Sequence, residues 1–286
     1  NYKVIDIIFA TILKNPRTLQ CLTKLSFMKK KILSLLLFTI FFLPQLTFGQ
    51  TGTEFWFAPP EVTSGHGGPN GDQPINLRLA TGNTASTVTI DQPALGGAAF
   101  AGAGTLVFVI PANSQVTIDL TPYITDLETS PQDQVLNTGL HILGTASFTA
   151  YYELNTTFNP EIFALKGANG LGKEFYTPFN TRWRNGNYTP TPYTSFDIVA
   201  SEDNTTVLIY PLKPLDGGHP ALTPFSVTLN RGQTYSGSVT STSGADNPAG
   251  TTIVSDKPIA VSVKDDSVWP EPWGGCKDLM GDPEVD

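Results

Sequence analysis

One loop of the chain places ionisable side chains among glycines. It contains His66 and Asp72, and Glu61 lies just before it. Glycines at this density let backbone amides approach a ligand closely. Histidine and carboxylates are residue types that bind metal ions or transfer protons. The sequence therefore indicates a ligand site in this loop, and a flexible turn with an exposed histidine is the alternative interpretation.

Aromatic residues concentrate in two further loops, at 180–188 and 269–275. Aromatic rings stack on sugars or on partner side chains, and the arginines of the first loop would bind carboxylates. Prolines stiffen the second loop, which lowers the ordering cost of binding. Plugs that cover the ends of the fold are the alternative interpretation. The predicted ligand-binding side chains are His66, Asp72, Arg182, Trp183, Arg184, Tyr188, Trp269 and Trp273.

Catalytic motifs do not accompany these loops. The sequence contains no Gly-x-Ser-x-Gly elbow, zinc-protease helix motif or phosphate loop. We therefore predict a protein that is not an enzyme and uses no cofactor. A carbohydrate-active hydrolase with His66, Asp72 and Glu61 near its site is the alternative. Calcium is a second alternative, without EF-hand spacing, at Asp265, Asp266, Asp278 and Asp282.

The segments that would carry these loops are short strands, and their order occurs twice. Apolar and β-branched residues alternate over short runs, as half-buried strands require. Turn residues at 201–204, 230–233 and 255–258 predict hairpins between them. The matched segments are 52–56 with 172–176, 75–80 with 195–200, 86–90 with 205–209, 108–120 with 225–237, and 139–152 with 250–263.

This repetition predicts an all-β fold of tandem β-sandwich-like units that arose by internal duplication. The predicted units are 50–168 and 169–286. Roughly seven strands in about 115 residues suit a β-sandwich. A β-propeller-like arrangement of the same strands is the alternative.

A leader precedes the predicted units. Met28 is followed by three lysines and the 12-residue apolar stretch 32–43, which predicts a signal peptide that ends near Gly49. The stretch is shorter than the roughly 20 residues that span a bilayer. We interpret 1–27 as a non-native upstream extension. Because the chain ends where the first unit gives way to the next, we expect a truncated second unit and further domains downstream.

The predicted mature part is strongly acidic. Residues 50–286 contain 10 Lys and Arg against 24 Asp and Glu, a balance of −14. This charge argues against nucleic acid as a partner and favours solubility outside the cell. Cys276 is the single cysteine of this part, so it pairs with another chain or a downstream residue, or packs as a small apolar side chain.

Four motifs of the second unit resemble the IgGFc-binding protein N-terminal-like domain. They lie at 195–207, 227–235, 255–261 and 274–282, and the resemblance extends over about 50–286. Bacterial relatives look like large secreted or cell-surface proteins with Ig-like or PKD-like repeats and a C-terminal sorting domain. The family has no catalytic residue set to transfer, and immunoglobulin binding is not carried over to this chain.

These observations predict a non-enzymatic, exported module of a bacterial cell-surface or secreted adhesin-like protein. Its expected partners are glycans or extracellular proteins, with no nucleic acid and no membrane span in the mature chain. A hydrolase, or an accessory module of one, and a structural spacer are the alternatives.

Overall fold

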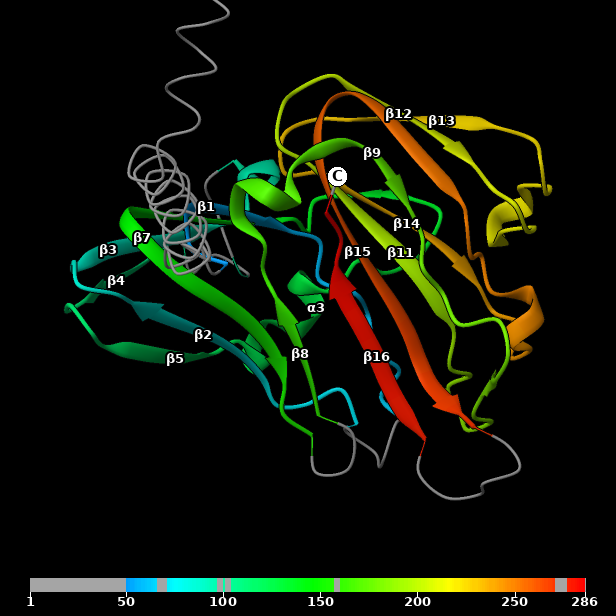
Figure 1. The fold of residues 1–286 in the computed structure, drawn as a ribbon, viewed down its shortest axis with the longest axis horizontal. Helices are drawn as coiled ribbons and strands as arrows, with labels where there is room; N and C mark the ends of the chain where they lie inside the picture. Colours follow the sequence, from blue (N-terminus) through cyan, green and yellow to red (C-terminus); the bar gives the residue numbers. More distant parts are fainter. Residues whose placement is uncertain are drawn as a thin grey trace, which may run out of the picture. The chain divides into compact units, whose positions relative to one another are not determined.

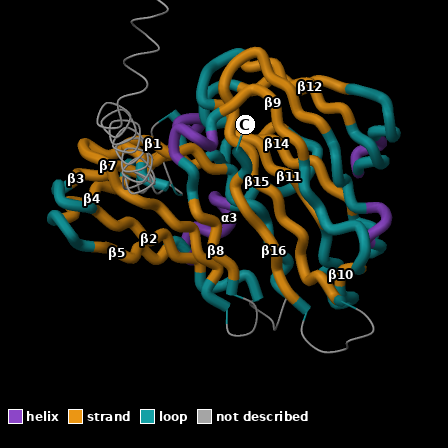
Figure 2. Tube along the Cα trace, in the orientation of Figure 1, coloured by secondary structure: helices purple, strands orange, loops and turns teal. Residues whose placement is uncertain are grey.

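The fold consists of strands joined by turns and short helical segments (Figure 2). The computed structural model describes residues 50–65, 71–96, 100, 104–156, 160–270 and 277–285. The predicted all-β class is confirmed, because strands make up about half of the structure. The predicted signal peptide, His66, Trp273 and Cys276 lie outside the described residues. Residues 50–286 form one compact unit that holds both sheets described below.

The described strands form a first sheet of seven strands and a second of nine (Figure 1). The first is a half-barrel and the second a nearly closed barrel. The first contains β1 (Gly52–Phe57), β2 (Ile75–Thr81), β3 (Ser86–Asp91), β4 (Leu106–Ile110), β5 (Gln115–Asp119), β7 (Leu140–Leu154) and β8 (Glu161–Ala164). The second contains β6 (Val135–Leu136), β9 (Gly172–Tyr176), β10 (Arg184–Asn185), β11 (Thr194–Ala200), β12 (Thr205–Tyr210), β13 (Phe225–Leu229), β14 (Thr234–Val239), β15 (Thr252–Trp269) and β16 (Asp278–Pro283).

Both sheets are organised around one long strand and share one pairing scheme. In the first sheet β7 pairs with β1, β2, β3 and β8. In the second sheet β15 pairs with the corresponding strands β9, β11, β12 and β16. The outer strands also correspond, since β5 pairs with β2 and β4 with β3, as β14 pairs with β11 and β13 with β12.

The turns that the sequence predicted as hairpins are corners. Strands β11 and β12 flank the turn 201–204, but each pairs with a different part of β15. The turn 230–233 joins β13 to β14, which pair with β12 and β11, and 255–258 lies within β15. The Asn204 amide donates to the Asn230 side chain over 3.1 Å, so two of the corners meet. The hairpin prediction was wrong because turn residues fix a chain reversal but not the partner of the next strand.

These corners explain how each sheet curls on itself into a barrel-like unit. Strands that bend at a corner pass from one half of the sheet to the other, and the two halves then face each other over side chains. The first sheet encloses Leu77 and Leu79, and the second encloses Phe196 and Ile198. Leu77 pairs with Tyr152 of β7, and Phe196 pairs with Val263, the residue of β15 that corresponds to Tyr152. Leu77 therefore corresponds to Phe196, and the predicted match of 75–80 with 195–200 was wrong by one residue. A one-residue slip moves each side chain to the opposite face of the sheet.

The two sheets are joined by exchanged segments and by a layer of side chains. Strand β6, which precedes β7 in the chain, pairs with β14 of the second sheet. In the opposite direction, Leu279 of β16 packs in the core of the first sheet. Trp56 and Ala58 pack against Val199 and Ala260 between the sheets. The face of β11 and β15 that carries Val199 and Ala260 is therefore buried against the first sheet.

Candidate functional site

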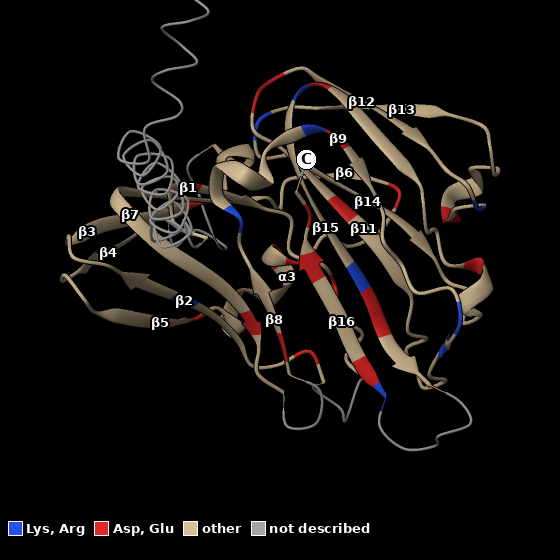
Figure 3. Ribbon diagram, in the orientation of Figure 1, with Lys and Arg blue, Asp and Glu red and all other residues tan. Residues whose placement is uncertain are grey.

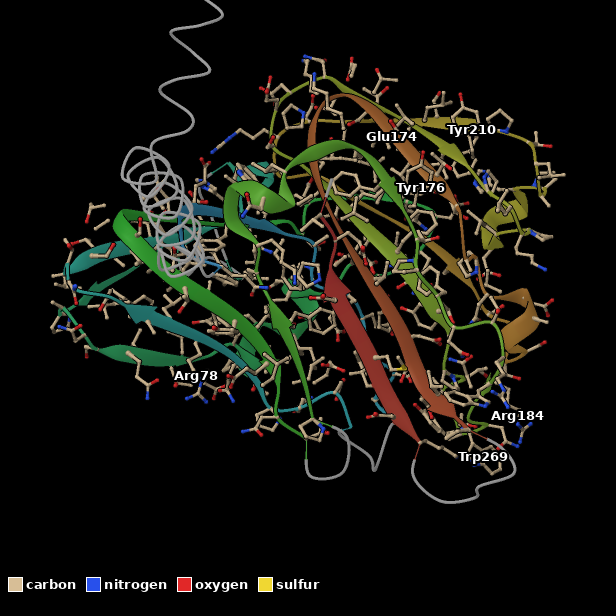
Figure 4. All side chains as sticks on the ribbon, in the orientation of Figure 1. Arg78, Glu174, Tyr176, Arg184, Tyr210 and Trp269 are labelled. Carbon is tan, nitrogen blue, oxygen red and sulfur yellow. The ribbon has the colours of Figure 1, made fainter. Side chains whose placement is uncertain are left out.

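A cluster of aromatic and cationic side chains lies at the end of β15. Strand β10 pairs with the last residues of β15 and sets Arg184 opposite Trp269. The Arg184 guanidinium lies 4.5 Å from the centre of the Trp269 ring (Figure 4). Lys277, which directly precedes β16, places its Nζ 5.3 Å from the same ring. The structure thus brings together two predicted residues and adds a lysine that the sequence analysis missed.

Two further aromatic residues of the loop also face cations. The Arg182 guanidinium lies 5.6 Å from the Trp183 ring, and the Lys277 Nζ lies 5.4 Å from the Tyr188 ring. Arg182 is exposed, whereas Trp183 is half-buried. We call the set Arg182, Trp183, Arg184, Tyr188, Trp269 and Lys277 the aromatic–cationic cluster. It is a concentration of positive charge in an otherwise acidic chain.

Side-chain hydrogen bonds fix the backbone of the loop that presents this cluster. The Asn180 Oδ1 accepts from the amides of Arg182 and Trp183 over 3.0 and 3.1 Å. The Asn180 Nδ2 donates to the Trp183 carbonyl over 2.9 Å. Further along, the buried Asn185 donates to the Asp265 carboxylate over 2.8 Å. The loop backbone is therefore held by these hydrogen bonds, which lowers the ordering cost of binding by the side chains of the loop.

Tyr188 has a structural role in this arrangement. Its hydroxyl donates to Asp266 over 3.0 Å, and Thr63, in the loop between β1 and β2, contacts the same hydroxyl over 3.3 Å. Burial, followed by the Asp266 charge, raises the pKa of Tyr188, so the phenol keeps its proton. Tyr188 presents its ring to Lys277, while its hydroxyl links β15 to the loop between β1 and β2.

Asp72, predicted as a ligand residue, lies inside the protein. It is 7% exposed, and burial raises the pKa of its carboxyl. Glu61 and Glu128 are its acidic neighbours, and burial together with the charges of Glu61 and Asp72 raises the pKa of Glu128 to about 9. These three carboxyls form an acidic cluster in which Asp72 is buried and Glu61 and Glu128 are half-buried. The sequence analysis grouped Glu61 with Asp72 because they lie close together in the chain. It did not include Glu128, which is distant in sequence.

Three of the four acids considered for calcium, Asp265, Asp266 and Asp282, contact other side chains of the protein. Asp265 accepts from Asn185, Thr194 and Asn247 at 2.8 to 3.1 Å. Asp266 accepts from Thr63 and Tyr188, and Asp282 lies 3.0 Å from the Lys166 ammonium. Within the part of the chain that the structure describes, no three His, Cys, Asp or Glu side chains are arranged to hold a metal ion.

A cleft of about 280 Å³ opens beside the cluster. Phe179 and Met280 give it an apolar wall, and Asp265, Asp282 and Glu284 give it carboxylates. It adjoins the cluster through Asn180, the residue that fixes the loop. The end of the second sheet therefore combines a cationic aromatic surface with an apolar cleft that carries acids.

This architecture defines a class of protein: an all-β protein built from two curled sheets. Residues 163–282 match the family described as IgGFc binding protein, which confirms the predicted resemblance over this range. The match covers most of the second sheet and the whole aromatic–cationic cluster. No curated protein matches the chain. None of the described helices is long and apolar enough to cross a membrane.

Proposed function

We propose that this chain is an exported module that binds an extracellular protein through its aromatic–cationic cluster. The observation that carries the proposal is the shared use of the Trp269 ring by Arg184 at 4.5 Å and Lys277 at 5.3 Å. The family match supports a binding role, because its description names a binding protein. Export and a place on a bacterial surface are supported by the predicted leader and by the acidic composition of 50–286.

The chemistry of the cluster indicates a partner that presents carboxylates next to apolar side chains. A guanidinium that stacks on an aromatic ring is held in one orientation by the ring, and guanidinium N–H groups bind carboxylates in a fixed geometry. Trp, Tyr and Arg are also the residues that contribute most to binding energy at protein interfaces. Contacts of this kind weaken as salt rises, because the charges are partly exposed.

Glycan binding is the second candidate function. The half-buried rings of Trp183 and Trp269 could stack on sugar rings, as aromatic residues in sugar-binding sites do. The two functions predict different ligands. If the chain binds glycans, it should bind a free acidic glycan and should not bind a deglycosylated protein.

The test compares the full chain with two variants on purified extracellular proteins and on a glycan array. The double variant Arg184→Ala, Trp269→Ala removes the central stack. Arg231→Ala is the matched control, because Arg231 stacks on Trp56 at 4.9 Å outside the cluster. We expect the double variant to lose at least tenfold in affinity for a protein partner and the control to retain it. Equal binding by both variants would refute the assignment, and binding to glycans alone would assign the second function.

A further inference from the structure

The most unusual group in the protein is the amine of Lys264 in the middle of β15. Its side chain is 0% exposed, and no described residue forms a hydrogen bond with its Nζ. The Nζ lies instead 3.2 Å from the centre of the Tyr193 ring. Figure 3 shows a basic segment of β15 that an acidic segment follows directly. Buried amines are normally paired or hydrogen-bonded, so this one requires an explanation.

The sheet register places the Asp197 carboxyl on the same face of the sheet as this amine. Lys264 pairs with Ser195 across β15 and β11, and Asp197 pairs with Ser262. Residues two apart in a strand point to the same face. Asp197 and Lys264 are therefore diagonal neighbours on the buried face between the sheets. Diagonal pairs of this kind lie about 7 Å apart, within reach of a lysine side chain.

The Asp197 carboxyl is unpaired at one of its two oxygens. Its side chain is fully buried, and its Oδ2 accepts from the Ser195 hydroxyl over 2.9 Å. Its Oδ1 has no hydrogen-bond partner in the described structure. The nearby Asp266 differs, because its two oxygens accept from Thr63 and Tyr188. Asp197 and Lys264 thus each leave a polar atom unused on the same buried face.

Burial shifts both members of this pair towards their neutral forms, an acid and an amine. Burial raises the pKa of Asp197 to about 6, which outweighs the opposing hydrogen bonds and the charge of Lys264. Burial also lowers the pKa of Lys264, against the opposing charges of Asp266 and Asp197. A desolvated neutral lysine is a nucleophile toward carbonyl carbon.

We propose that Lys264 and Asp197 condense to an intramolecular amide bond that joins β15 to β11. The Lys264 nitrogen forms a bond to the Asp197 Cγ, and one C–O bond of the carboxyl breaks. The departing hydroxyl takes one hydrogen from the amine and leaves as water, so no other reactant is required. The bond satisfies the Nζ without a charge, and it ties the central strands of the second sheet covalently at the face that contacts the first sheet.

Mass spectrometry of the full chain in denaturant tests this bond. The wild-type chain is expected to be lighter than Lys264→Met or Asp197→Ala, each relative to its own sequence mass, by one water or about 18 Da. The leader is the same in all three chains, so its processing cancels. A tryptic digest of the wild type should also yield a branched peptide that contains both residues and is uncleaved after Lys264.

A third variant identifies the chemistry. Asp197→Asn would lose ammonia, about 17 Da, in place of water if the same amine attacks the same carbon. The peptide map of the wild type decides the question even where a variant fails to fold. Full mass in the folded wild type would overturn the proposal, and a branch between other residues would overturn the assignment to this pair.

Discussion

Replacement of Glu128 by glutamine is expected to stabilise the protein, and increasingly so as the pH rises. Glu128 follows the short helix α3 (Ile124–Leu127), and its Oε1 accepts from the Val62 amide over 3.4 Å. Burial is the main reason that its pKa is raised, and the charges of Glu61 and Asp72 add to it. Glutamine keeps the shape and the acceptor oxygen but has no charge to bury.

The magnitude follows from linkage between protonation and folding. The pKa of Glu128 rises from 4.5 in the unfolded chain to about 9 in the folded one. Between these values the folded state binds more protons than the unfolded state, so stability falls as the pH rises through this window. The loss is about 1.4 kcal/mol per pH unit, which gives about 3 kcal/mol at pH 7. This is an upper value, because water reaches part of the side chain.

Urea denaturation followed by tryptophan fluorescence measures the effect. The difference in unfolding free energy between Glu128→Gln and wild type should be about 1 kcal/mol near pH 5 and reach about 3 kcal/mol at pH 7. Groups common to both chains cancel in this difference. The control is Glu153→Gln, which breaks a two-pronged contact with Arg78 at 2.7 and 3.0 Å. It should lower stability slightly, because exposed ion pairs contribute little, and the loss should not grow between pH 5 and pH 8.

The result that would refute this reasoning is a gap that stays constant or shrinks between about pH 5 and pH 8. A variant less stable than wild type at pH 7 would also show that Glu128 is ionised in the folded state and held by partners. The acidic cluster of Glu61, Asp72 and Glu128 would then stabilise the folded state rather than destabilise it.

Two further predictions concern the contact between the sheets. Asp266→Ala removes the carboxylate that accepts from the Thr63 amide and the Tyr188 hydroxyl. Urea denaturation should show a loss in unfolding free energy of about 4 kcal/mol, against about 1.5 kcal/mol for Tyr188→Phe. Equal losses in the two variants would contradict the role of Asp266. Gly281→Ala would place a Cβ 2.3 Å from the Phe163 ring. Thermal unfolding should show a loss of stability of about 1–3 kcal/mol, which a second substitution, Phe163→Leu, should partly reverse. Additive losses in the double variant would show that the two residues do not touch.

The strands were predictable because their local signals agree with their burial. Alternation of apolar residues along 205–209 matches the alternating burial of β12, and the same holds for β2 and β3. Pairing was less predictable, because it depends on contacts far apart in the sequence. Strand β15 holds both β11 and β12 along its length, so the turn at 201–204 became a corner.

The site was predictable only in part, for the same reason. Arg184 and Trp269 were both predicted, but their contact depends on the pairing of β10 with the end of β15. Lys277 has no local signal, since it joins the cluster only because β16 pairs back along β15. Lys264 and Asp197 were not predicted as a pair, because a single lysine in a strand is normally solvent-exposed.

Equivalent positions of the two sheets have different surroundings, and this difference bears on where binding occurs. Trp56 and His141 lie side by side across β1 and β7 and stack at 4.3 Å, and Arg231, in the turn between β13 and β14, lies over the Trp56 ring.

The corresponding row of paired residues in the second sheet consists of Tyr176 of β9, Thr252 of β15 and Tyr210 of β12. Trp56 is 6% exposed, whereas Tyr176 is 60% and Tyr210 is 42% exposed. Figure 4 shows these tyrosines at the end of the second sheet away from Arg184 and Trp269. One row therefore serves the contact between the sheets, and the same row in the second sheet faces solvent. The second sheet thus presents aromatic side chains at both of its ends, and the Arg184 and Trp269 variants distinguish the cationic end from the tyrosine end.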